Sequence, residues 1–232
     1  MGPVATLRVL SYNVRSLRDD PEAVARVVKA CRPDVLCLQE APRLLGWRRK
    51  RRLLASRCGL RLAVNRRPGG LAILVRPEIS VLLSHHHRLR RYRGLHLRAL
   101  SLVVLNHQGH EALVAVTHLD LDPRARLQHA EELLALLARH QAPVVLAADV
   151  NELPGGPTWR LLTRAFTDTA ELAPAGELFT FTARRPRTRI DAVLADPRFG
   201  VVGAGVPEEP SRADLVAATD HRPLLAELLL SY

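Results

Sequence analysis

Short apolar runs with polar residues attached to them recur from one end of the chain to the other, and this pattern constrains the fold more than any other feature. Apolar runs of this kind, bounded by turn residues, are typical of buried strands. The attached polar groups are Ser11-Tyr12-Asn13, Gln39-Glu40, Thr117-His118, Asp149-Val150-Asn151, Arg189-Ile190-Asp191 and Thr219-Asp220-His221. Because ligands gather where strands of such sheets end, the pattern predicts one active site that all six groups share.

Two stretches repeat the same strand–helix–strand order. The first predicts strands at residues 7–10 and 35–38 around a helix from Pro21 to about Ala30, with Asp20 as its N-cap. The second predicts strands at residues 113–116 and 144–147 around a helix that Asp122-Pro123 opens and that runs to about Arg139. The similarity is either an internal duplication or a coincidence of a common unit, and both readings place polar groups at strand ends.

The rest of the chain predicts further strands and one short helix. Strands are expected at residues 70–75 and 97–105 in the middle of a sheet, closing strands at 190–194 and 224–230, and a helix near 158–165. With 232 residues, 47% of them hydrophobic, the chain can bury one large core. We therefore expect a single α/β domain over residues 1–232.

The charge balance favours polyanionic partners. The chain carries 34 basic residues, only two of them lysines (Lys29 and Lys50), and a formal charge of +11. Residues 43–67 contain nine arginines and no acid, residues 85–98 are also basic, and residues 184–189 directly precede Asp191. A groove so lined would bind a DNA or RNA backbone with little sequence preference. The alternative is an exposed helix at residues 47–58, with Trp47, Leu53 and Leu54 turned inward and the arginines merely solvated.

Cysteine usage and the N-terminal sequence predict a cytoplasmic protein. Cys31, Cys37 and Cys58 form no zinc-type pair, and their odd number argues against a complete disulfide framework. Residues 1–12 enter a strand pattern without a leader, and no run is long enough to span a membrane. We expect a monomer, buried unreactive thiols, and a polar loop rather than a metal site at His85-His86-His87.

The acidic residues imply a metal. Four carboxylates, those of Glu40, Asp149, Asp191 and Asp220, would repel one another in one cleft unless a divalent cation, Mg²⁺ or Mn²⁺, neutralised part of the charge. If extended geometry persists beyond Asp149, its side chain and that of Asn151 point to the same side. Asp191 could accept a proton from the His221 imidazole and hold it in one tautomer.

These motifs, in this order over residues 7–225, resemble the endonuclease/exonuclease/phosphatase superfamily of metal-dependent phosphoesterases. The resemblance implies a four-layer α/β/β/α sandwich of two face-to-face mixed sheets with helices outside. It implies that Asn13, Glu40 and Asp220 hold the metal. It implies for the catalytic residues that Asp149 activates water, Asn151 binds the phosphoryl oxygen, His118 contacts the phosphate or assists the leaving group, and Asp191 orients His221.

The chain departs from the superfamily pattern at several positions. Ala148 and Thr219 replace the usual glycine and serine, Glu40 is followed by Ala41-Pro42-Arg43, and no tryptophan precedes Arg189. These departures do not favour a dedicated abasic-site repair role. A nuclease is our main hypothesis; the alternatives are a phosphatase or phosphodiesterase for a small phosphorylated metabolite or lipid headgroup, and an inactive polyanion-binding module.

Overall fold

The computed structural model describes residues 5–230. Residues 1–4, where the predicted leaderless N terminus starts, and residues 231–232 lie outside the described part of the chain. Within residues 5–230, no helix is long and apolar enough to cross a membrane.

Two six-stranded mixed sheets form the centre of the protein. The first has the strand order β11 (Gly200–Gly205), β12 (Leu224–Leu230), β1 (Ala5–Asn13), β2 (Val35–Gln39), β4 (Ala72–Val75), β3 (Arg61–Asn65). The second has the order β5 (Ser80–Arg88), β6 (Ala99–His107), β7 (His110–His118), β8 (Val144–Asp149), β10 (Asp191–Ala195), β9 (Thr167–Asp168).

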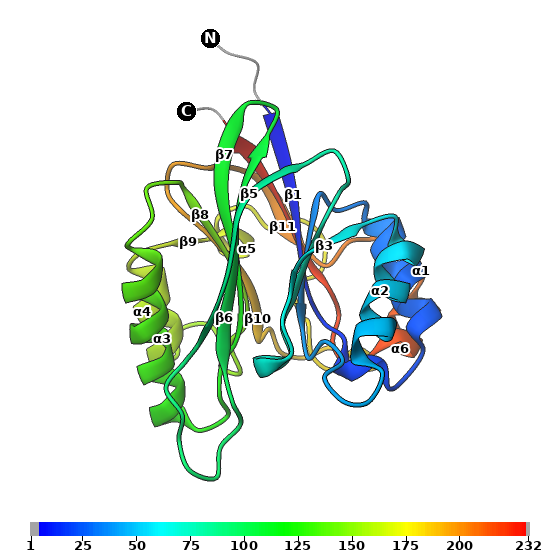
Figure 1. Ribbon diagram of the computed structural model, residues 1–232, viewed down its shortest axis with the longest axis horizontal. Helices are drawn as coiled ribbons and strands as arrows, with labels where there is room; N and C mark the ends of the chain where they lie inside the picture. The colour runs from blue at the N-terminus through cyan, green and yellow to red at the C-terminus, as the bar shows by residue number, and fades with distance from the viewer. Residues whose placement is uncertain (1–4, 231–232) are drawn as a thin grey trace.

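Helices cover the outer face of each sheet (Figure 1). The first sheet packs against α1 (Pro21–Cys31), α2 (Trp47–Cys58) and α6 (Arg212–Ala218). The second packs against α3 (Pro123–Leu137) and α4 (Pro157–Thr163), and the short α5 (Thr169–Leu172) follows β9. Two 3-10 turns lie at Arg15–Leu17 and Pro68–Gly70. The predicted four-layer α/β/β/α sandwich is confirmed.

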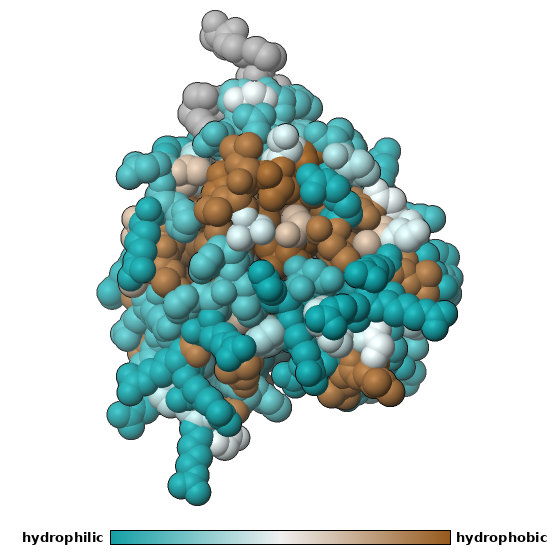
Figure 2. Space-filling view, in the orientation of Figure 1, coloured by the Kyte–Doolittle hydropathy of each residue, from teal (hydrophilic) through white to brown (hydrophobic). Residues whose placement is uncertain are grey.

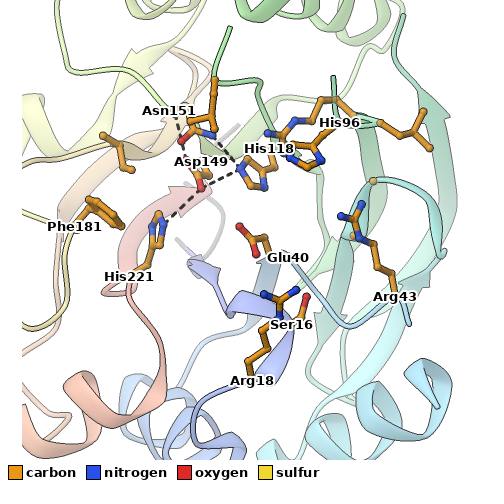
Figure 3. A pocket seen from close by; sticks show the side chains of 16 residues that line it. Ser16, Arg18, Glu40, Arg43, His96, His118, Asp149, Asn151, Phe181 and His221 are labelled. Atoms are coloured by element: carbon orange, nitrogen blue, oxygen red, sulfur yellow. Dashed lines mark hydrogen bonds and ion pairs between the residues drawn. The ribbon is translucent and has the colours of Figure 1, made fainter. Parts of the chain in front are cut away.

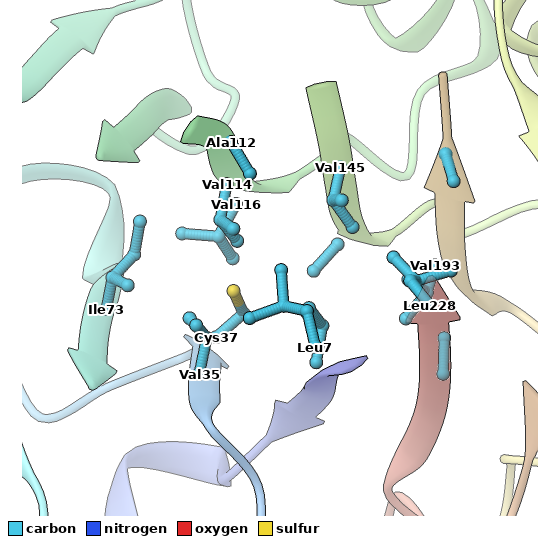
Figure 4. Packing of buried hydrophobic residues seen from close by; sticks show 14 of the residues in the cluster. Leu7, Val35, Cys37, Ile73, Ala112, Val114, Val116, Val145, Val193 and Leu228 are labelled. Atoms are coloured by element: carbon cyan, nitrogen blue, oxygen red, sulfur yellow. The ribbon is translucent and has the colours of Figure 1, made fainter. Parts of the chain in front are cut away.

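The core consists of three buried apolar layers that follow the period of two along each strand. In β1, Leu7 and Val9 face the other sheet, whereas Leu10 faces the helices. In β8, Val145 faces the other sheet and Leu146 faces α3 and α4. Figure 4 shows the layer between the sheets, in which side chains from both interlock. This packing places the ends of β1 and β8 at fixed positions relative to each other.

Both predicted strand–helix–strand units are present, with parallel pairing of β1 with β2 and of β7 with β8. Asp20 accepts hydrogen bonds from the amides of Glu22 and Ala23, and Asp122 accepts one from Ala125, so the predicted N-caps are correct. The helices end within two residues of the expected positions, at Cys31 and Leu137.

The prediction of a loop at His85-His86-His87 is wrong, because these residues lie in β5. This edge strand is largely exposed, so it shows no apolar alternation that would reveal it. The sequence also gave no signal for β3, β9, β11, α5 or α6. The strands expected in the middle of one sheet are β4 and β6, which belong to different sheets, each one place from an edge.

The arginine run forms the helix of the alternative reading, α2 with the expected bounds 47–58 and with Arg52 exposed, but it departs from that reading at two residues. Leu54 is buried as expected, but Leu53 is 45% exposed and Arg51 is 1% exposed. The Arg51 guanidinium donates to the carbonyls of Ala41, Pro42, Arg66 and Leu71 and to the side chain of Asn65. Arg51 is therefore a structural residue that joins the segment after β2 to the segment before β4.

The cysteines are unpaired and serve as apolar residues, as expected. Cys31 and Cys37 are buried, and burial raises the pKa of the Cys31 thiol to about 12. Cys58 is only partly buried, which differs from the expectation.

Candidate active site

Polar residues from both sheets meet at the strand ends that point toward the lower edge of Figure 1. His118 ends β7 and pairs in register with Asp149, the last residue of β8. Asp191 begins the antiparallel β10 and pairs with Asp149 from the other side. Asn13 ends β1 of the other sheet. The lower half of this face is largely hydrophilic (Figure 2).

Asp149 is the centre of the cluster and is 1% exposed. Its Oδ2 accepts a hydrogen bond of 2.9 Å from Nδ2 of Asn13. The same oxygen lies 3.3 Å from Nε2 of His118 and 3.8 Å from Nε2 of His221. One carboxylate oxygen thus faces side chains from three separate segments, as Figure 3 shows for the two histidines.

Glu40 enters the site from the turn after β2. Its φ is +47°, a left-handed conformation that costs a non-glycine residue on the order of 1 kcal/mol. The Glu40 carbonyl accepts from the amide of Ser16, and the amide of Ala41 donates to Gly70, both at 2.7 Å. The turn is thus held on both sides, and Oε1 of Glu40 lies 3.4 Å from Nδ2 of Asn13.

Asn151 reaches the site by a route that differs from the expected one. The strand ends at Asp149, and Asn151 has a φ of +54°, so extended geometry does not continue. The Asn151 amide nitrogen donates to the carbonyl of Leu119 and lies 3.0 Å from Nε2 of His118. A turn in which Oδ1 of Asp149 accepts from the backbone amide of Asn151 holds this arrangement.

His118 is neutral in this setting. Burial lowers its pKa to about 3, opposed by Asp149 and assisted by the nearby cations, chiefly Arg98. Because Nδ2 of Asn151 is fixed as a donor by Leu119, Nε2 of His118 accepts its hydrogen bond, which assigns the proton to Nδ1.

His221, in contrast to His118, is protonated. Burial disfavours its charge, but Asp191 outweighs burial, with smaller contributions from Asp149 and Asp220, and raises the pKa to about 10. Oδ2 of Asp191 lies 2.9 Å from Nδ1 of His221. The Phe181 ring packs on the imidazole with 4.9 Å between centroids. The two histidines of the site therefore have opposite charge states.

Asp220 is not brought into the cluster. Its side chain is 37% exposed and lies 3.4 Å from Nε of Arg15. Ligand atoms of Asp149, Asp191 and His221 lie within 4.8 Å of one another, but a protonated His221 has no lone pair for a metal, so in this group the two carboxylates are the candidate ligands. This group differs from the predicted set of Asn13, Glu40 and Asp220, although Asn13 contacts Asp149 and Glu40 contacts Asn13.

The cluster opens into a cavity of about 420 Å³. The cavity is lined by Glu40, His118, Asp149, Asn151 and His221 among the predicted residues. It is also lined by Arg43, His96 and Arg98, from the two basic stretches expected to line a substrate groove, and by Ser16, Arg18 and Phe181, which the sequence did not assign to the site. A signal existed for Arg98, because it lies at the end of a basic stretch, directly before the strand that begins at Ala99.

Few of the predicted basic residues reach this cavity. From the run at residues 43–67, Arg43 is the one that lines it among the described residues. Arg189, in the basic stretch before Asp191, is buried and pairs with both carboxylate oxygens of Asp168 at 2.8 and 2.9 Å. Arg189 therefore supports the fold and is closed to substrate.

Residues 10–221 match the model of a family described as the Endonuclease/Exonuclease/phosphatase family. A solved structure of that family from Bacteroides vulgatus is similar with a TM-score of 0.82 and 20% identity, over 98% of this chain and 100% of that chain. A mannosyl-6-phosphatase from Bacteroides thetaiotaomicron VPI-5482 gives 0.78 and 20%, over 96% and 99%. TDP2 from D. rerio, complexed with a single-strand DNA product, gives 0.72 and 15%, over 97% and 99%. No curated protein matches the chain by sequence. At these identities the structural likeness shows the fold alone.

Proposed function

Because the chain belongs to the endonuclease/exonuclease/phosphatase family, we propose that it is a divalent-metal-dependent phosphodiesterase that cleaves nucleic acid with an activated water. The observation that supports this most is the single buried carboxylate oxygen of Asp149 that faces Asn13, His118 and His221. Such a cluster can orient a nucleophile and stabilise charge on phosphorus at once.

The residues present fit a hard cation. Glu40, Asp149 and Asn13 supply side-chain oxygens, the ligands that Mg²⁺ and Mn²⁺ prefer. Asn13 directs its amide nitrogen toward both carboxylates, so its side chain would turn to offer the oxygen. Oδ1 of Asp191 is buried without a hydrogen-bond partner, as expected of an atom with a further ligand. When bound, the cation would neutralise the carboxylates and polarise a phosphoryl oxygen.

The protein groups divide the remaining work. Asp149 accepts a proton from the attacking water or orients it. Both N–H groups of Asn151 are used, by Leu119 and by His118, so Asn151 would release His118 to donate to a phosphoryl oxygen. His221, held protonated by Asp191, donates from Nε2 to the charge that develops on the phosphoryl group. Neutral His118 contacts the phosphate or assists the leaving group through the network that includes Asn151.

Nucleic acid is the proposed substrate class because Arg18 and Arg43 line the cavity, where they could contact backbone phosphates. Such contacts bind a strand whatever its bases. We propose that the enzyme is monomeric and cytoplasmic; the free thiols at Cys31, Cys37 and Cys58 suit a reducing compartment.

The test is an assay of wild type and Asp149→Ala on supercoiled plasmid, linear duplex, single-stranded DNA and RNA, with bis-p-nitrophenyl phosphate as a generic diester. We expect Mg²⁺-dependent cleavage that falls by about 10³-fold or more in the variant. The matched control is Asp214→Ala, which removes an acid outside the cavity. Metal-independent binding without cleavage would instead identify an inactive polyanion-binding module.

A phosphatase or phosphodiesterase for a small phosphorylated metabolite or lipid headgroup is the second candidate. The cavity of about 420 Å³ is in the range of small-molecule sites, about 300–1,000 Å³. The similar mannosyl-6-phosphatase fold also suits this reading. Turnover of sugar phosphates or lipid headgroup esters, with plasmid and RNA left intact, would replace the nuclease proposal with this one.

A further inference from the structure

Arg98 differs from the other buried arginines of the described chain. Arg51, Arg126, Arg189 and Arg222 each donate from at least two nitrogens, or to two or more acceptors, within the protein. Arg98 is 6% exposed, yet the contact it makes is one weak interaction of 3.4 Å from Nε to Oδ2 of Asp120.

The terminal nitrogens of Arg98 are therefore free to bind a ligand. Among the described residues no acceptor is in hydrogen-bond contact with them, and they are not enclosed, since neither is among the buried side-chain atoms that lack a partner. Arg98 also lines the active-site cavity. A buried guanidinium with two open N–H groups at a cavity wall is suited to an oxyanion.

Two further cationic or protonatable side chains line the same cavity as Arg98. Arg43 and His96 are exposed residues that line the cavity with Arg98. In Figure 3 they lie on the far side of Glu40 from Phe181 and His221. The cavity thus has an acidic side, suited to a metal, and a cationic side.

We infer that Arg98, with Arg43 and His96, forms a subsite for a second phosphate of the substrate, next to the phosphate that is cleaved. The inference rests on the proposed phosphoesterase function and narrows its substrate to esters that carry two phosphates. Such a substrate is either a polynucleotide strand, with successive phosphodiesters, or a small bisphosphorylated compound.

Binding without turnover tests the subsite. Isothermal titration calorimetry in EDTA compares thymidine 5′-monophosphate with thymidine 3′,5′-bisphosphate. We expect wild type to bind the bisphosphate about tenfold or more tightly, and Arg98→Gln to lose that preference while its affinity for the monophosphate changes less than about twofold. Arg139→Gln, an exposed arginine beyond α3, is the matched control and keeps the preference.

Arg98→Gln leaves the buried Asp120 with a weaker partner and could therefore destabilise the fold. Arg43→Gln provides a second test, because Arg43 is exposed and its replacement does not threaten folding. It is expected to reduce the preference about threefold or more. Equal weakening of both ligands in Arg98→Gln would mean that Arg98 contacts the reacting phosphate or only balances Asp120, and this overturns the inference. No preference in wild type overturns it as well.

Steady-state turnover shows whether the second phosphate belongs to a polynucleotide or to a small bisphosphorylated compound. It also separates a failure of the proposed function from a failure of the proposed subsite. The pair of substrates is a 5′-phosphorylated thymidine dinucleotide and inositol 1,4-bisphosphate, and the higher kcat/KM identifies the source. If neither these compounds nor the nucleic acids and bis-p-nitrophenyl phosphate of the first assay are hydrolysed but the binding preference holds, the proposed function fails and the subsite stands. If hydrolysis occurs without the preference, only the subsite is wrong.

Discussion

Asp191 and His221 form a buried pair in which Oδ2 of the carboxylate lies 2.9 Å from Nδ1 of the imidazole. Both side chains are buried, and the carboxylate holds a protonated ring whose other nitrogen lies 3.8 Å from Oδ2 of Asp149. This contact supports the proposed role of Asp191 as a positioning residue for His221.

Asp191→Asn is expected to lower kcat by about 10²–10⁴-fold with a much smaller change in KM, because the amide cannot stabilise the imidazolium and can favour the wrong tautomer. Steady-state kinetics on bis-p-nitrophenyl phosphate measures this. Asp214→Asn, which removes an acid in α6, serves as the control. An unchanged kcat in Asp191→Asn would contradict the role of the pair.

Glu40 and Asp220 are expected to differ in their effect on metal use. Glu40→Gln removes a carboxylate beside Asn13 and should raise the Mg²⁺ concentration for half-maximal activity by about tenfold or more. Asp220 pairs with Arg15 outside the cluster, so Asp220→Asn should change the Mg²⁺ concentration for half-maximal activity less than Glu40→Gln does. Mg²⁺ titrations of both variants and of the exposed control Glu78→Gln measure this. A larger effect of Asp220→Asn would restore Asp220 as a principal ligand.

Removal of the metal should abolish activity and leave the fold intact. EDTA is expected to stop hydrolysis, and added Mg²⁺ or Mn²⁺ to restore it, because the apolar layers between the sheets hold the strands without the site. Activity and circular dichroism are measured on the same sample. Full turnover in EDTA would contradict the metal-dependent mechanism.

Arg51→Met is expected to destabilise the protein by about 2–4 kcal/mol, because it leaves buried backbone carbonyls without their donor. The neighbouring Arg52 is exposed, and Arg52→Met should change the free energy of unfolding by less than about 0.5 kcal/mol. Urea unfolding of the two variants measures the difference. Equal stability would show that Arg51 is not a structural residue.

His86 is expected to make stability depend on pH. Burial, assisted by Arg66, Arg88, His85 and Arg51, lowers the pKa of His86 to about 4, below the usual value of about 6.5. The unfolded chain then binds the extra proton between these values, so stability is complete above pH of about 6.5 and falls as the pH drops toward 4.

His86→Gln should remove this component. After allowance for partial solvent exposure, the stability that wild type loses between pH 7.5 and 5 should exceed the loss in the variant by about 1 kcal/mol. Urea unfolding at both pH values measures it. The same pH dependence in both proteins would show that His86 is protonated equally in the folded and unfolded chains.

Local sequence patterns predicted those helices and strands that are marked by a few neighbouring residues. Asp20 and Asp122 were recognisable as N-caps because each precedes a proline at the first helical position. The buried strands β2 and β8 were recognisable because both faces are covered, which makes their residues continuously apolar. The edge strand β5 was not recognised because most of its residues are exposed, which leaves no alternation of apolar and polar residues along it.

The sequence by itself determined the two strand–helix–strand units and the set of polar residues at the strand ends, since strand period and helix caps are local properties of the chain, whereas the four-layer architecture was implied by the resemblance to the superfamily. Only the tertiary structure decided which charged residues support the fold and which face the cavity. Arg51 and Arg52 are neighbours with opposite roles, and Arg98 became a candidate ligand-binding residue only when its surroundings were known. The physical reason is that the charge state and the hydrogen-bond partners of a side chain depend on burial and on groups far away in sequence, as with Asn13 and Asp149, which lie 136 positions apart.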